Sequence, residues 1–171
     1  FVAVQYAAQA GWSAGFLRVP LAFGSWIPIA GILMIVLYFL SAHDIFHWSH
    51  EALYQEGAES APLINKKAPY FFFRGEAGKF PIFFIFRMLL FFGMWYWFLI
   101  MIRKNMLAED MENTTAYWYK NRVISAWFLI FFAISSSIAA WDWVMSIDTH
   151  WFSTMFGWYV FSSWWVTGLS V

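Results

Sequence analysis

Four long apolar runs dominate this sequence, and each is about as long as a bilayer is thick. A helix needs about 20 apolar residues to cross a hydrocarbon core of about 30 Å. Inside a bilayer every backbone N–H and C=O group must find its partner within the chain, so such runs fold as α-helices. The sequence therefore predicts an all-α, polytopic transmembrane bundle with spans at 20–41, 80–102, 117–141 and from 151 onward.

The two ends of the chain are also apolar. Residues 1–11 resemble the last turns of a preceding membrane helix, and the sequence stops at Val171 within an apolar run. We therefore expect 1–171 to be a single transmembrane helical domain that is an internal fragment of a longer subunit. Because successive spans alternate in direction, the connections 42–79 and 142–150 should share one face of the membrane.

The composition supports a membrane location and excludes several classes of protein. The chain is 62% hydrophobic, 25% aromatic and only 12% charged, whereas soluble domains are about a quarter charged. Its net charge is zero, which argues against a nucleic-acid partner. It has no cysteine, so disulfides, thiolate-held iron–sulfur clusters and c-type haem attachment are excluded within the chain. All four histidines lie at span ends, which argues against b-type haem, and we expect no cofactor bound by this chain alone.

The connection A-W-D-W-V-M-S-I-D-T-H-W at 140–151 holds the most suggestive polar residues. Asp142, Asp148 and His150 are candidates for a proton path, because ionisable groups near a low-dielectric interior are costly and can have pKa values moved toward neutrality. Asp148 has an alternative role as the N-terminal cap of the span expected from about residue 151. Capping does not explain Asp142, which follows the C-terminal end of a span, where the helix dipole disfavours an anion.

Two further residues extend the proton-path hypothesis into the membrane. Arg87 lies about 10 Å deep in its span, measured from the face of the Asp-Thr-His loop. It can either extend its side chain back to the interface or pair with Asp142 or Asp148. Ser136, at the centre of a run of three serines, either lines a hydrated path or provides a small-residue contact between helices.

A second polar cluster follows the first span, in the sequence H-D-I-F-H-W-S-H. On a helix, His43, His47 and His50 would lie along one stripe, next to Asp44. Converging neutral imidazoles can bind a metal, but His and Trp are also typical of a polar helix end at the membrane interface. We assign no metal here and treat the four residues as quinol-binding or interface candidates, within an interfacial helix expected at about 44–55.

Together these motifs resemble a known family. The order H-D-I-F-H-W-S-H, then K-K-A-P-Y-F-F-F-R, then A-W-D-W-V-M-S-I-D-T-H-W-F-S-T-M-F-G-W-Y-V-F is similar to the membrane subunits of bacterial alternative complex III, the quinol:cytochrome c oxidoreductase. The likeness is greatest to the second of its two membrane subunits of the polysulfide-reductase (NrfD-like) anchor type. It extends over nearly the whole chain.

The resemblance implies a multi-pass subunit of the bacterial inner membrane, without haem of its own. Its partners would be an iron–sulfur subunit, a multihaem c-type cytochrome and a paralogous membrane subunit, in a complex that oxidises menaquinol or ubiquinol. In that family the second membrane subunit is a candidate for proton conduction. The matching positions here are Asp142, Asp148 and His150 in the connection at 140–151, and His43, Asp44, His47 and His50 after the first span. Two alternatives stay open: a direct quinol-binding subunit in which His150 or Asp148 acts as general base, and a transporter or ion channel.

Overall fold

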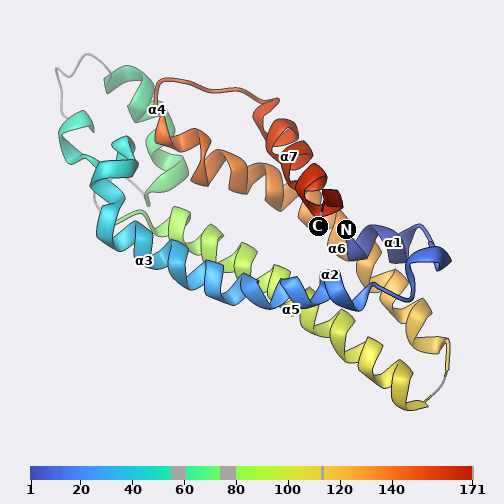
Figure 1. Cartoon of the computed structure of the whole chain (residues 1–171). Helices are drawn as coiled ribbons and strands as arrows, with labels where there is room; N and C mark the ends of the chain where they lie inside the picture. Colours follow the sequence, from blue (N-terminus) through green and yellow to red (C-terminus); the bar gives the residue numbers. More distant parts are fainter. Residues whose placement is uncertain (55–60, 74–79, 113, 171) are drawn as a thin grey trace.

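The computed structural model of the chain describes residues 1–54, 61–73, 80–112 and 114–170, and within these ranges it is helical and contains no strand. Three stretches are long and apolar enough to cross a membrane: Arg18–Ile45, Ile82–Glu112 and Ala116–Ile147. Large apolar side chains, among them Ile32, Leu40 and Trp127, are exposed along them, as expected for helices that face lipid. The all-α, multi-pass bundle predicted from the sequence is confirmed (Figure 1).

The first span is more broken than predicted. It consists of helix α2 (Arg18–Phe23), a 3₁₀ turn at Gly24–Trp26 and helix α3 (Ile27–Ile45). Pro28 lies in the first turn of α3, where its missing N–H costs nothing. A side chain at Gly24 would collide with Leu99 of helix α5 (Ile82–Glu112), so glycine permits the close approach of the two segments.

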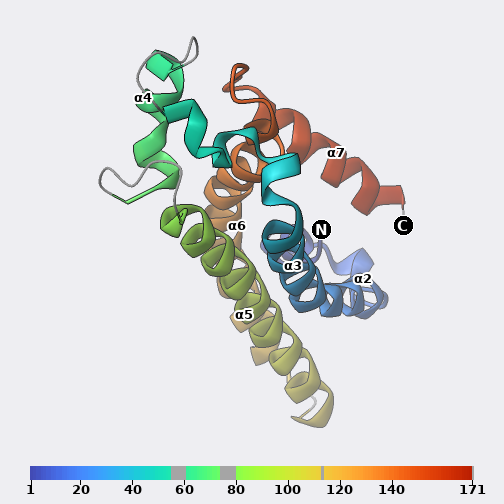
Figure 2. The same ribbon diagram turned by 90° about the vertical axis from the view of Figure 1, so that its left-hand side faces the viewer.

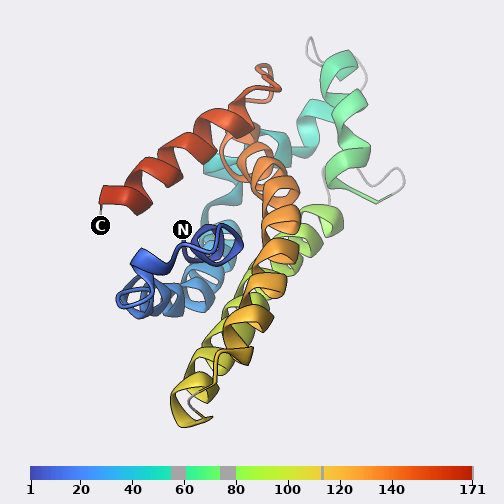
Figure 3. The same ribbon diagram turned by 90° about the vertical axis from the view of Figure 1, so that its right-hand side faces the viewer.

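Helices α5 (Ile82–Glu112) and α6 (Ala116–Trp143) form an antiparallel pair at the centre of the bundle. They lie side by side in Figure 3, and α3 packs along α5 in Figure 2. The short helix α1 (Val2–Ala7) packs against α6. At that end of the bundle Arg18 forms an ion pair with Asp110, which joins the start of the first span to the end of the second.

The fourth predicted span corresponds to helix α7 (Phe156–Ser170), which folds back along α6 (Figure 1). Its 15 described residues extend about 22 Å, less than a hydrocarbon core requires. The contact with α6 is close, because a Cβ atom at Gly157 would lie only 3.0 Å from the side chain of Ser137. This is the small-residue helix contact that the sequence offered as one alternative for the serine run.

At the end of the bundle away from the Arg18–Asp110 ion pair, the structure differs from the prediction. The expected interfacial helix at 44–55 is replaced by two 3₁₀ turns, His47–Ser49 and Glu51–Tyr54, because Phe46 adopts an extended conformation and ends α3 at Ile45. A separate helix, α4 (Ala61–Phe71), follows. Gln55 and Arg74, the last residues of the expected helix and of the K-K-A-P-Y-F-F-F-R motif, lie outside the described residues.

A cluster of aromatic side chains joins the two 3₁₀ turns and helix α4 to the end of the bundle. Trp48 is 1% exposed and stacks on Phe71 of α4, with ring centroids 4.2 Å apart and planes at 7°. Phe84 from the start of α5 and Tyr38 from α3 complete the cluster. The turns of 47–54, helix α4 and the loop after α6 are thereby gathered at one end, as expected for connections that share a membrane face (Figure 2).

Candidate functional site

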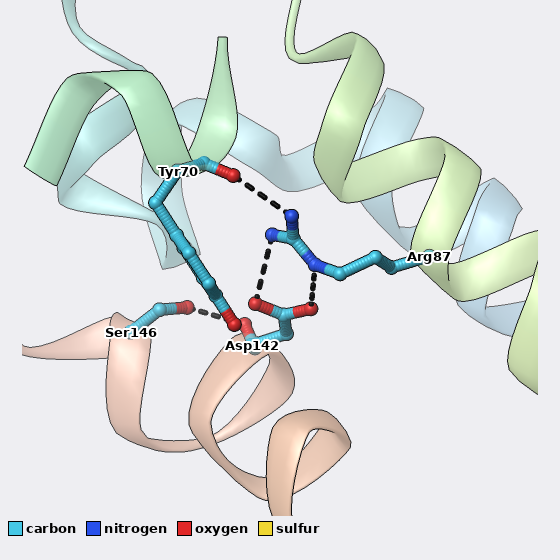
Figure 4. Close-up of polar contacts among 4 residues, drawn as sticks. All are labelled: Tyr70, Arg87, Asp142 and Ser146. Carbon is cyan, nitrogen blue, oxygen red and sulfur yellow. Dashed lines mark hydrogen bonds and ion pairs between the residues drawn. The ribbon is translucent and has the colours of Figure 1, made fainter. Parts of the chain in front are cut away.

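A buried ion pair joins the two central helices at this end of the bundle. Arg87 of α5 donates to Asp142 of α6 through Nε to Oδ2, at 2.7 Å, and through Nη2 to Oδ1, at 3.0 Å (Figure 4). The Asp142 side chain is fully buried and that of Arg87 is 17% exposed. Of the alternatives considered for Arg87, the structure contains the pairing with Asp142.

Tyr70 of α4 is the third member of the site. Its main-chain carbonyl accepts a hydrogen bond from Nη1 of Arg87 at 2.8 Å, and its ring lies 4.0 Å beneath the guanidinium carbon (Figure 4). This carbonyl belongs to the last turn of α4, where helix carbonyls have no partner inside the helix and remain available to accept. Arg87 is therefore fixed by a carboxylate, a carbonyl and an aromatic face, each from a chain segment outside α5.

The positive charge of Arg87 compensates the buried negative charge of Asp142 in this arrangement. Asp142 lies in the last turn of α6, where the helix dipole opposes a negative charge, and Arg87 supplies the compensating cation. Ser146 donates to the main-chain oxygen of Asp142 and closes the end of the helix (Figure 4). Burial, followed by the negative charge of Asp142, raises the pKa of the Tyr70 hydroxyl above its usual range, while Arg87 opposes that shift.

Asp148 and His150 lie apart from the pair, at the exposed surface of the loop after α6. The carboxylate of Asp148 accepts a hydrogen bond from the backbone N–H of His150 at 2.9 Å. The alternative of helix capping is wrong for Asp148, because α7 begins at Phe156 and not near residue 151. Asp148 instead stabilises a turn within the loop.

Ser136 is buried within α6 but is not part of the pair. Its hydroxyl donates to the carbonyl of Ala133 at 3.4 Å, and it precedes Asp142 by about 1.7 turns on the same helix. Its neighbour Ser135 accepts a hydrogen bond from the indole of Trp95 at 3.0 Å. The Trp95–Ser135 bond joins α5 to α6, whereas the Ser136 bond stays within α6. The direct polar contacts of Asp142 come from other residues.

His43, His47 and His50 lie close together, but not on one helix as predicted. The single helical stripe is wrong, since His43 lies in α3 and His47 in the following 3₁₀ turn. The turn nevertheless brings the ring of His50 within 5.1 Å of His43 and 5.6 Å of His47, centroid to centroid, and Nε2 of His50 lies 2.9 Å from the main-chain oxygen of His43. Asp44 is exposed beside them. No group of three His, Cys, Asp or Glu side chains in the described ranges is arranged to hold a metal ion.

A pocket next to the ion pair was not foreseen. Its volume is about 190 Å³, and it lies between the turns of 47–54, helix α4, the end of α6 and the loop that follows. Tyr70 and Ser146 both line it, so it adjoins the Arg87–Asp142 pair. Lys67 of α4 also lines it and donates to the carbonyl of Thr149 at 2.5 Å, which ties α4 to the loop. Lys67 and Tyr70 stand in the quoted K-K-A-P-Y motif, which was the one sequence signal for their involvement.

Comparison of the chain with protein-family models, with curated proteins and with solved structures finds no match.

Proposed function

We propose that this chain is a membrane subunit of a respiratory quinol:cytochrome c oxidoreductase, where it provides scaffold and a proton path coupled to quinol oxidation. The observation that carries the proposal is the buried pair of Arg87 and Asp142 between two spanning helices. Ionisable groups at such positions are expensive and most often serve transport of protons or ions. The sequence motifs that resemble alternative complex III supply the respiratory context.

The surroundings of Asp142 provide a route for protons. Asp142 is fully buried, Tyr70 and Ser146 connect its environment to the adjoining pocket, and Asp148 lies at the exposed rim of that pocket. A proton that reaches Asp142 must displace the guanidinium of Arg87, since a neutral carboxylic acid no longer holds it as an ion pair. Release of Arg87 from the carboxylate, with its hydrogen bond to the Tyr70 carbonyl kept, would then alternate with re-formation of the ion pair as Asp142 takes up and releases the proton.

The electrons in this proposal travel in partner subunits. This chain has no cysteine and its histidines lie at one end of the bundle, so haem c and iron–sulfur clusters are assigned to the partner subunits. The exposed residues His43, Asp44 and His47 lie at the same end as the ion pair and provide a surface for such partners. The bacterial inner membrane is the location that this assembly requires.

A copurification experiment tests the proposal. The protein is purified in mild detergent by a tag, and its visible spectrum is recorded before and after addition of quinol. The proposal predicts c-type haem in the preparation, supplied by partners and reduced by quinol. A colourless preparation of a single kind of subunit would contradict it and would favour the transporter or channel alternative.

A further inference from the structure

A groove runs along the bundle between the start of the first span and the second half of helix α5. Its volume is about 360 Å³. Two separate contacts hold its walls in place: the ion pair of Arg18 with Asp110, and the close approach of Gly24 to Leu99. The groove is therefore a fixed feature of the fold, and none of its lining residues belongs to the site described above.

The charges along the groove do not cancel. Three charged residues line it, namely Arg18, Arg103 and Asp110. Arg18 and Asp110 neutralise each other in their ion pair. Arg103 is exposed and has neither a hydrogen bond nor an ion pair with any residue that the structure describes. The groove therefore carries one unmatched positive charge, on a guanidinium whose planar array of N–H donors suits a phosphate or a carboxylate.

The position of Arg103 along its helix places this charge at the level of the lipid headgroups. Arg103 lies about 32 Å along α5 from Ile82, which is close to the thickness of the hydrocarbon core of about 30 Å. On the membrane side of Arg103 the groove is lined mainly by apolar side chains, among them Leu99 and Ile100, and Ile100 is 43% exposed. The groove thus combines a cation at headgroup depth with apolar walls at the depth of acyl chains.

We infer that this groove binds an anionic glycerophospholipid, with the phosphodiester on the guanidinium of Arg103 and an acyl chain along Leu99 and Ile100. The single negative charge of a phosphodiester matches the one unmatched positive charge of the lining. Basic pockets between membrane helices are a known mode of recognition for anionic headgroups. A free phosphate ion has no acyl chain to cover the apolar walls. This site does not depend on the respiratory function proposed above.

Native mass spectrometry of the purified protein in mild detergent tests the site, with phosphatidylglycerol and phosphatidylcholine of the same acyl chains as probes. The wild type should bind phosphatidylglycerol more tightly than phosphatidylcholine. Arg103→Gln should raise the Kd for phosphatidylglycerol about threefold to tenfold and remove most of this preference. Arg103→Lys keeps the charge and should retain much of the preference. An excess of inorganic phosphate should not displace the bound phosphatidylglycerol.

Lys104→Gln is the matched control, because Lys104 is the next residue of α5 and is also exposed, but it does not line the groove. It removes the same charge at the same depth and should leave the preference for phosphatidylglycerol unchanged. An equal loss in Lys104→Gln and Arg103→Gln would indicate a general attraction to the basic surface and would overturn the inference. Equal affinity of the wild type for the two lipids, or displacement by phosphate alone, would overturn it as well.

Discussion

Arg87 and Asp142 meet on neighbouring spanning helices through two hydrogen bonds of 2.7 and 3.0 Å, with the carboxylate shielded completely from solvent. A second ion pair, Arg18 with Asp110, lies at the other end of the bundle, but its side chains are 63% and 39% exposed. The two pairs have the same chemistry and differ in burial. Comparison of the two pairs therefore measures how burial changes the contribution of an ion pair to the stability of the protein.

Arg87→Met should strongly destabilise the protein, by about 3–5 kcal/mol, because it leaves the Asp142 carboxylate buried without a counter-charge. Arg18→Met should cost at most about 1 kcal/mol, as is usual for exposed pairs. Thermal unfolding in detergent measures both. The double variant Arg87→Met with Asp142→Leu should recover much of the loss, and equal losses in the double and single variants would contradict this account of the pair.

Gly157→Ala should weaken the packing of α7 on α6, because the new Cβ atom would lie 3.0–3.2 Å from the side chain and backbone of Ser137. Overpacking of this kind costs about 1–3 kcal/mol. Limited proteolysis of the loop before α7 should become faster. Gly168→Ala serves as the control, since a Cβ atom at that position would meet nothing within 4 Å, and it should be neutral or slightly stabilising. Equal cleavage rates in the two variants would refute the close contact.

The stability of the α4 end of the bundle should fall at alkaline pH. Burial raises the pKa of Tyr54 from 10.0 to about 12, and its hydroxyl donates to the carbonyl of Trp48 at 2.8 Å. The folded protein therefore holds this proton more tightly than the unfolded chain, so the contribution is complete below pH 10 and is lost as the pH rises toward 12.

Melting temperatures of the wild type and Tyr54→Phe across this alkaline range provide the test. The phenylalanine variant should be less stable at neutral pH and should show a smaller decline in alkali. Tyr119→Phe, at a position that is 60% exposed, should follow the wild type. Parallel curves for the wild type and Tyr54→Phe would contradict the role of the buried hydroxyl.

The sequence predicted the parts of this fold that depend on local pattern. Apolar length identified the three spanning helices of the described part of the chain, and the depth of Arg87 made Asp142 one of its two possible partners. The histidine stripe was wrong because Phe46 leaves the helical conformation, which the residue spacing does not reveal. Helix α4 was missed because Pro69 and the polar residues near it resemble a loop.

The pocket depends on contacts between distant segments and could not be predicted from periodicity. Trp48 meets Phe71, and Lys67 meets Thr149, only after α4 has docked on the bundle. Tyr70 joined the ion pair through its main-chain carbonyl, which is a contact that residue type does not encode. Contacts of this kind between distant segments can be identified only from the three-dimensional structure.

The most direct test of the central claim is proton release per quinol oxidised in vesicles that contain the wild-type complex or its Asp142→Asn variant, with Asp110→Asn as the control. Asparagine keeps the shape of the side chain but cannot carry the proton. The account predicts that Asp142→Asn retains the haem content of the wild type and loses most of its coupled proton release or quinol oxidation, whereas Asp110→Asn retains both. Normal turnover and normal proton release in Asp142→Asn would contradict it.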